Sequence, residues 1–265
     1  MKPQIQNIAN NQNETNMGII PKDPSPSPLI NTQGYFNELS DLNSVDIVQK
    51  TSYIDYLFLC TENVFQVHYP DKQKRILYEM YENSDCCERC CCFRFRSFNM
   101  KINNLVNQKN PNSIILDSHK TCALPCIYGF GCGKPEITID IKSPVQSHLG
   151  KVRMNYESCV CAICDNHIDI TDKSGNLRYV IKKNDICIGC FVGCAGGCCC
   201  KCCSINFDIC ENNNVVGSVT KLTCDRCRIC ATKADIYTLI FPPNATPEEK
   251  MLLIMGTILL DSINF

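Results

Sequence analysis

Residues 251–260, which read Met-Leu-Leu-Ile-Met-Gly-Thr-Ile-Leu-Leu, decide the fold of this 265-residue chain. They are apolar on every face of a helix, and such helices are normally buried in protein. Thr246 is a natural N-cap, Pro247 fits the first helical position, and Glu248 and Glu249 complement the helix dipole. The run is about half of the ~20 residues that a bilayer core requires. The sequence favours a central core helix, with a membrane-inserted segment as the alternative. The residues expected in the core or the membrane are Met251, Leu252, Leu253, Ile254, Ile258, Leu259 and Leu260.

Upstream of this helix, β-branched and aromatic runs alternate with turn residues at a spacing of roughly 8–12 residues. Residues 136–142 alternate isoleucine with polar residues, and residues 204–208 follow the same pattern. Such alternation predicts half-buried antiparallel strands. The runs expected to be strands are 63–68, 75–81, 98–103, 113–117, 136–142, 151–155, 176–182, 204–208, 215–222 and 237–241. This number of strands indicates a barrel or a sandwich, and closure into a barrel removes exposed edges.

Part of the pattern is repeated along the chain. The first copy consists of a cysteine cluster, an alternating strand and a turn, and it leads to Gly150. The second copy has the same order and leads to Gly217. Ile137 precedes Gly150 by 13 residues, and Ile205 precedes Gly217 by 12 residues. The repeat predicts a duplicated sheet whose halves close on each other.

The first 45 residues are rich in Asn, Gln, Pro and Ser and have no apolar period. Such a segment buries too little apolar surface to offset its ordering entropy, so we expect a disordered tail at 1–45 and one domain at 46–265. The formal net charge is −1, so no global field favours nucleic acid or an anionic membrane, and we expect no nucleic-acid partner. We see no export signal before Ser44, and we therefore expect the cysteines to face a reducing compartment.

Cysteine is the unusual feature of the composition, with 24 residues. In a reducing compartment three uses remain: metal ligation, lipid attachment and packing as a small hydrophobe. Five of the six residues at 198–203 are cysteines. Successive side chains of a strand or turn point to different faces, so several of these thiols must be exposed and open to acylation. The spacings at 161/164, 187/190 and 224/227/230 are instead typical of zinc or iron–sulfur ligands.

Several segments resemble the phospholipid scramblase family when taken in order. Residues 81–90, Tyr-Glu-Asn-Ser-Asp-Cys-Cys-Glu-Arg-Cys, and residues 96–102, Arg-Ser-Phe-Asn-Met-Lys-Ile, are similar to its acid–Cys–Cys stretch and to Arg-Pro-Phe-x-Met-x-Ile. Ser97 replaces the usual proline. Residues 198–209 look like its Cys-rich turn before a strand, and 217–221 are similar to Gly-Lys-Ile-x-Lys. Ala234-Asp235, Phe241-Pro242 and the last helix with Asp261 match its C-terminus. The resemblance covers about residues 48–265.

This resemblance implies a tubby-like fold, a closed antiparallel barrel around the C-terminal apolar helix. It implies calcium-stimulated, energy-independent movement of phospholipids between leaflets by a protein attached to a membrane by palmitate. We expect the cytosolic face of the plasma membrane. Two acyl chains anchor a protein stably, whereas one anchors it only marginally. The cysteines expected to carry lipid are Cys122, Cys126, Cys132, Cys198, Cys199, Cys200, Cys202 and Cys203.

The resemblance also implies calcium ligands near the last strand. Asp235 matches an acidic position of the family, whereas the later acidic positions fall on Asn244 and Thr246, and Lys233 replaces another acid. Calcium requires six to eight oxygen ligands, roughly, and fewer carboxylates weaken its binding. We expect Asp235 and Asn244 to form at most a weak calcium site.

Two other classes of protein stay open. One is a soluble zinc- or iron–sulfur-binding β-domain, and the other is an adaptor of scramblase fold that moves no lipid. An enzyme is not expected, because the sequence contains no GxxxxGK[ST] phosphate loop and no GxSxG nucleophile elbow.

Overall fold

The structure is a computed structural model, and it describes residues 36–50, 63–71, 73–84, 98–106, 114–120, 136–141, 147–155, 167–184, 205–222 and 236–263. All of these residues belong to one compact unit, Thr32–Phe265. The described residues form a short 3-10 helix, η2 (Asn37–Leu39), a C-terminal helix, α5 (Pro247–Ile263), and twelve strands. The strands are β1 (Ser44–Lys50), β2 (Val64–His68), β3 (Ile76–Asn83), β4 (Phe98–Asn104), β5 (Ile114–Lys120), β6 (Glu136–Ile141), β7 (Ser147–Asn155), β8 (His167–Asp172), β9 (Leu177–Lys183), β10 (Ile205–Glu211), β11 (Asn214–Leu222) and β12 (Ile236–Ile240).

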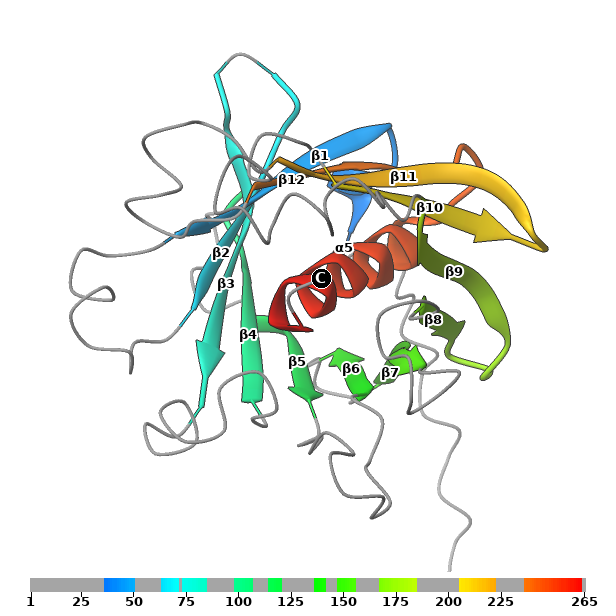
Figure 1. The fold of residues 1–265 in the computed structure, drawn as a ribbon. Helices are drawn as coiled ribbons and strands as arrows, with labels where there is room; N and C mark the ends of the chain where they lie inside the picture. The colour runs from blue at the N-terminus through cyan, green and yellow to red at the C-terminus, as the bar shows by residue number, and fades with distance from the viewer. Residues whose placement is uncertain are drawn as a thin grey trace, which may run out of the picture. The chain divides into compact units, whose positions relative to one another are not determined.

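Every strand pairs antiparallel with the strands that precede and follow it in sequence. The first strand also pairs with the last: Ile47 of β1 lies opposite Val67 of β2 on one side and Tyr237 of β12 on the other. The order of neighbouring strands therefore returns to its start. The predicted β-rich class, an antiparallel sheet with a C-terminal helix, is confirmed (Figure 1).

Helix α5 lies inside this sheet, as Figure 1 shows by the red coil among the strands. The seven helix residues singled out from the sequence are each at most 3% exposed. Gly256 allows close contact with the sheet, because a Cβ there would lie 3.0 Å from Cδ1 of Ile181 and 3.3 Å from Cδ1 of Ile170. The helix thus occupies the interior, the first of the two alternatives that its sequence left open. No helix among the described residues combines the length and apolar character needed to cross a bilayer.

Described structure is present on the N-terminal side of position 46. Strand β1 begins at Ser44, and Phe36 and Leu39 before it are at most 1% exposed in the core. The division into a tail at 1–45 and a domain at 46–265 stays a prediction. The remainder of the predicted tail, residues 1–35, lies outside the described residues. Strands β1 and β8 were absent from the sequence prediction.

The antiparallel order sorts the connections between strands onto two opposite ends of the sheet. Chain segments that leave even-numbered strands, such as 173–176 after β8 and 212–213 after β10, turn back at one end, which we call the hairpin end. Strands β1, β3, β5, β7, β9 and β11 finish at the other end. We call it the cysteine end, because 23 of the 24 cysteines, all except Cys210, belong in sequence to the six segments that follow these strands.

Five hairpins share one irregularity next to the hairpin end. In each, the second strand skips one residue relative to the first, as between β10 and β11, where Ile209 faces Gly217 and Cys210 faces Val215. The skipped residues are Leu77, Ile115, Leu149, Arg178 and Val216. A bulge of this kind increases the local twist of a strand pair, which assists the curvature of the sheet.

The predicted internal repeat corresponds to two of these bulged hairpins. Gly150 in β7 and Gly217 in β11 both lie opposite the last residue before the bulge. A Cβ on Gly150 would lie 2.4 Å from the carbonyl oxygen of Thr171, and one on Gly217 would lie 2.6 Å from that of Ile240. Both glycines are therefore required by a close approach to the next strand. Because five hairpins carry the bulge, the repeat that the sequence revealed is part of a wider regularity.

Candidate functional site

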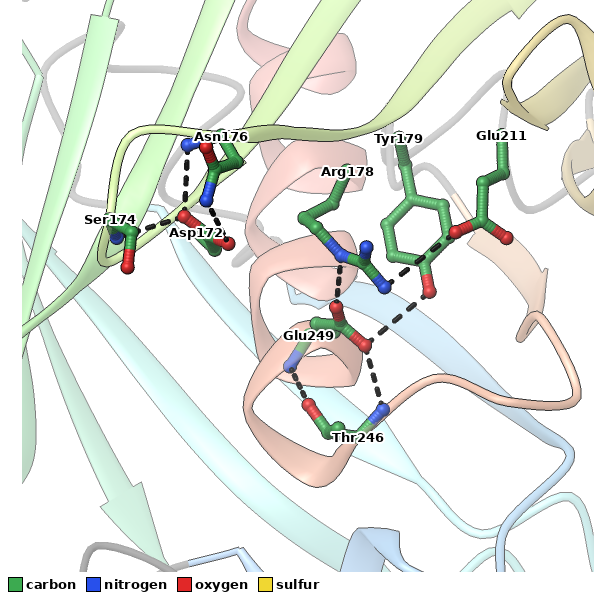
Figure 2. Close-up of polar contacts among 8 residues, drawn as sticks. All are labelled: Asp172, Ser174, Asn176, Arg178, Tyr179, Glu211, Thr246 and Glu249. Atoms are coloured by element: carbon green, nitrogen blue, oxygen red, sulfur yellow. Dashed lines mark hydrogen bonds and ion pairs between the residues drawn. The ribbon is translucent and has the colours of Figure 1, made fainter.

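The clearest polar cluster of the described residues surrounds the first turn of α5 at the hairpin end (Figure 2). Thr246 and Glu249 form a reciprocal cap. The Glu249 carboxylate accepts the backbone N–H of Thr246 at 2.9 Å, and the Thr246 hydroxyl oxygen accepts the backbone N–H of Glu249 at 3.3 Å. Such a capping box satisfies two N–H groups that a helix start leaves unpaired. The predicted N-cap role of Thr246 is confirmed.

Glu249 also joins the helix to β9. Arg178 Nε donates to Glu249 Oε1 at 2.6 Å, Tyr179 Oη donates to Glu249 Oε2 at 3.4 Å, and Arg178 Nη2 lies 3.6 Å from Glu211 Oε1. The hydrogen bond and the charge of Glu249 raise the pKa of the Arg178 guanidinium. Burial, together with the Glu249 charge, raises the pKa of Tyr179 to about 12. The cluster is therefore a fixed ion-pair network, in which both oxygens of one carboxylate are used.

Arg178 is an exception among the five bulge residues. Leu77 is fully buried, Leu149 is 6% exposed, and Val216 packs against the core, whereas Arg178 places a charged group at the corresponding position. An aliphatic side chain there would fill space, but Arg178 instead reaches Glu249 on the central helix. This role of Arg178 could not be predicted from the sequence, because Glu249 is 71 residues away and the bulge is visible only in the strand register.

A second polar contact, made by Lys250, joins the start of α5 to the chain segment before β1. Lys250, which is 4% exposed, donates through Nζ to the carbonyl oxygens of Leu39, Ser40 and Leu42 at 2.8, 2.8 and 3.0 Å. Burial lowers the pKa of Lys250, and the charge of Asp41 acts in the opposite direction. Lys250 thus satisfies carbonyl groups around η2 that would otherwise be buried without partners.

Other ionisable side chains are buried toward the cysteine end. Tyr237 Oη donates to Asp261 Oδ1 at 3.0 Å near the end of α5, and Lys221 Nζ lies 5.3 Å from the centre of the Tyr237 ring. Glu82 is 2% exposed, and its carboxylate accepts hydrogen bonds from the side chains of Asn63 at 2.6 Å and Ser84 at 2.7 Å. The interior is thus polar near this end and apolar around the middle of α5.

The cysteines expected to carry lipid lie outside the described residues. The three of the first cluster, Cys122, Cys126 and Cys132, belong to the β5–β6 connection, and those at 198–203 belong to the β9–β10 connection. Both connections start and finish at the cysteine end. The structure describes a single cysteine, Cys210, which is 4% exposed. Groups of three or more potential metal ligands do not occur among the described residues.

Of the two residues predicted as calcium ligands, Asn244 is described, and it is exposed four residues after β12. Asp235 lies outside the described residues. A calcium site that uses both residues therefore stays a prediction.

The fold defines a class of protein: one antiparallel β-sheet wrapped around a buried C-terminal helix. The sequence profile of the Scramblase family matches residues 24–265, and the chain belongs to this family. The chain is 25% identical over 249 residues to phospholipid scramblase 2 of Homo sapiens, covering 93% of the chain and 75% of that protein. It is 24% identical over 249 residues to phospholipid scramblase 1 of Homo sapiens, covering 93% and 70%. For phospholipid scramblase 2 of Bos taurus the identity is 23%, covering 93% and 76%.

The family resemblance stated from the sequence is thereby confirmed. The match begins at residue 24, which is earlier than the resemblance at about residue 48. The family consists of scramblases rather than enzymes, and this agrees with the expectation that the chain has no catalytic site.

Proposed function

We propose that this protein binds membrane phospholipids and moves them between leaflets without an energy source. One observation carries the proposal: the scramblase match extends over 242 residues, from 24 to 265, and the relatives that it resembles are named phospholipid scramblases. The proposed fold is the tubby-like barrel of that resemblance. Because no phosphate loop is present in the sequence, movement would follow the lipid gradient.

The lipid would move along the outside of the sheet. Helix α5 fills the interior with side chains such as Leu253 and Met255, which are fully buried, and protein interiors are close-packed. A phospholipid that entered there would have to displace the helix and so unfold the domain. Polar groups on the outer surface, or between copies of the protein, would instead replace water around the headgroup.

Acylated cysteines would attach the protein to the cytosolic face of a membrane, the plasma membrane being the proposed one. The two predicted acylation clusters lie in different connections, at 121–135 and 184–204, yet both connections are anchored at the cysteine end. Acyl chains carried by these two connections could enter the same bilayer together. Two acyl chains give stable attachment, whereas one does not. Simultaneous attachment would orient the sheet with this end toward the membrane.

A lipid-movement assay tests the transport proposal. The full chain is reconstituted, under reducing conditions and without nucleotide, into vesicles that contain a fluorescent phospholipid in both leaflets, and a membrane-impermeant reductant is added outside. Scrambling predicts that quenching proceeds into the inner-leaflet pool, whereas empty vesicles keep that pool fluorescent. Membrane binding with a fully protected inner pool would contradict transport and favour an adaptor.

Hydroxylamine tests the attachment, because it cleaves thioesters. We expect it to release protein isolated from cell membranes, and mass spectrometry before treatment should find acyl chains in 121–135, in 184–204 or in both. If every cysteine carries a free thiol while the protein stays on membranes, the acylation proposal is wrong. Stoichiometric zinc or iron in the purified protein would favour the metal-binding alternative.

Calcium would act weakly through Asp235. Asn244 would contribute an uncharged carbonyl oxygen, and the single carboxylate of Asp235 supplies too little charge for tight binding of a hard dication. Calorimetric titration should show millimolar affinity or weaker, or none. Micromolar binding that persists in Asp235→Asn would contradict this proposal.

A further inference from the structure

The chain crosses the hairpin end of the sheet before it enters β1, and we call this segment, residues 36–43, the strap. On one side, the Glu38 carboxylate accepts hydrogen bonds from Tyr78 Oη of β3 and from Asn104 Nδ2 of β4. On the other side, the carbonyl oxygen of Asn43 accepts the backbone N–H of the first residue after β12 at 2.9 Å. Strands β1 and β2 separate β12 from β3 in the sheet, so the strap passes from one wall to another.

The inner face of the strap covers the end of the core. Phe36 and Leu39 are at most 1% exposed, and they belong to the same buried cluster as Met251 of α5. Leu42 is partly buried against this cluster. The exposed residues of the strap are polar, and they are Asn37, Ser40, Asp41 and Asn43. The strap therefore separates the start of α5 and the apolar interior from solvent at this end.

Lys250 of α5 holds the strap from inside. Its ammonium group donates to the carbonyl oxygens of Leu39, Ser40 and Leu42, which all belong to the strap. Movement of this one segment therefore breaks all three hydrogen bonds together. It also opens Lys250 to water, and water can take the place of the carbonyl groups, so the net cost of opening stays modest.

The backbone of the strap is poorly connected to the sheet when it is compared with a strand. Strand β9 is hydrogen-bonded to β8 on one side and to β10 on the other. The backbone hydrogen bonds of the strap are local, with Phe36, Asn37 and Leu39 as acceptors for residues three positions later, and a single described one, at Asn43, reaches beyond it. Segments with few connections of this kind open at a lower free energy than the whole domain unfolds.

We propose that the strap is a lid over the hairpin end, which opens while the strands stay paired and which Lys250 and Glu38 hold closed. It swings about Asn43, where the chain enters β1. Opening exposes the first turn of α5 and the apolar end of the core, so the lid controls access to the interior. This inference is independent of the proposed lipid transport, which takes place on the outside of the sheet.

Hydrogen exchange of the full chain, measured by mass spectrometry under reducing conditions, tests the lid. In the wild-type protein, the amides of Leu39, Ser40 and Leu42 should exchange at least about tenfold faster than those of β8 and β9, after correction for intrinsic rates. Urea below the unfolding transition should accelerate exchange in the strands and leave exchange in the strap nearly unchanged, because lid opening exposes little surface. Equal protection and an equal response to urea would mean that the strap opens only when the domain unfolds, and would contradict the proposal.

Lys250→Met tests which side chain holds the lid, because methionine keeps the straight aliphatic stem and removes the ammonium group. Exchange in the strap should become at least about tenfold faster, since even a weak charged hydrogen bond of ~1.5 kcal/mol corresponds to that factor. Glu38→Gln should act in the same direction with a smaller factor, and it serves if Lys250→Met does not fold.

The matched control is Lys221→Met, which changes another nearly buried lysine, 7% exposed, close to Tyr237 and away from the strap. Its contacts persist when the lid opens, so any loss of stability should accelerate exchange in the strands and leave exchange in the strap unchanged. Circular dichroism establishes that each variant is folded. If Lys250→Met and Glu38→Gln leave exchange in the strap unchanged, or if Lys221→Met accelerates it as much, the assigned fastening is wrong.

Discussion

Replacement of Arg178 by leucine tests the ion pair that joins β9 to the central helix. Leucine occupies the equivalent bulge position in β3 and β7, as Leu77 and Leu149, so the fold tolerates its shape there. The change removes the 2.6 Å contact with Glu249 and leaves a carboxylate whose side chain is only 10% exposed. We therefore expect Arg178→Leu to lower the free energy of unfolding.

The magnitude follows from the burial of the two partners. Exposed ion pairs contribute ~0–1 kcal/mol, and removal of one partner from a fully buried pair costs ~3–5 kcal/mol. Glu249 approaches the buried limit, but Arg178 is 38% exposed, and solvent there screens the interaction. An intermediate cost of about 2 kcal/mol is expected for Arg178→Leu. Glu249→Gln should cost less, about 1 kcal/mol, because Arg178 keeps its contact with Glu211 and water.

Urea unfolding of the full chain, followed by circular dichroism under reducing conditions, measures both changes and their combination. The double variant Arg178→Leu/Glu249→Gln should cost less than the sum of the single variants, with a coupling energy of about 1 kcal/mol. Lys182→Leu, an exposed change in the same strand, is the control and should stay within about 0.5 kcal/mol of wild type. The reasoning is refuted if Arg178→Leu resembles this control, or if the coupling energy is below about 0.3 kcal/mol.

Three further predictions concern the core and one turn. Leu253→Asp should prevent folding, because an unpaired buried carboxylate costs several kcal/mol and the whole domain is stable by only ~5–15 kcal/mol. If circular dichroism shows that the variant is soluble and folded, the interior position of α5 is contradicted. Gly256→Val should lower the free energy of unfolding, measured in urea, by about 1–3 kcal/mol, because a Cβ at this position would lie 3.0 Å from Ile181 Cδ1. In Gly256→Ala, a gain in helix propensity of ~1 kcal/mol offsets the crowding. Equal effects of the two variants would exclude this account. Burial raises the pKa of Asp172, but hydrogen bonds from Asn176 and from the backbone of Ser174 outweigh this effect and hold the pKa below the ordinary value of an aspartate. The ionised carboxylate therefore stabilises the turn above that value, and the contribution is lost as pH falls through the lowered pKa; the stability difference between wild type and Asp172→Ala should shrink in acid, and a difference independent of pH would contradict the assignment.

Much of the fold could be predicted from local patterns in the sequence. The alternation of isoleucine and polar residues at 136–142 and the all-round apolar stretch at 251–260 depend only on the periods of a strand and a helix, and both appear as β6 and α5. The capping role of Thr246 was equally local. Strands β1 and β8 were not predicted from the sequence. Strand β1 starts inside a segment whose composition is typical of a polar tail, and β8 is a short run beside a cysteine-rich segment.

The candidate site was predictable only where it is local. Thr246 and Glu249 lie three residues apart and form a sequence-readable cap, whereas Arg178 and Tyr179 reach Glu249 across about 70 residues. Lys250 contacts carbonyl groups more than 200 residues earlier in the chain. Such partners depend on strand register and on where a bulge shifts a side chain, and no local period contains that information.

By itself, the sequence determined the β-rich class, the apolar helix and the membership of the scramblase family, because composition, periodicity and ordered motifs are properties of the chain read in one direction. The tertiary structure decided two things: that the helix lies inside the sheet, and that the strand ends that flank the cysteine-rich segments meet at one end of the sheet. The physical reason is the antiparallel pairing of successive strands, which alternates the ends at which strands finish and so brings together strand ends that are distant in sequence.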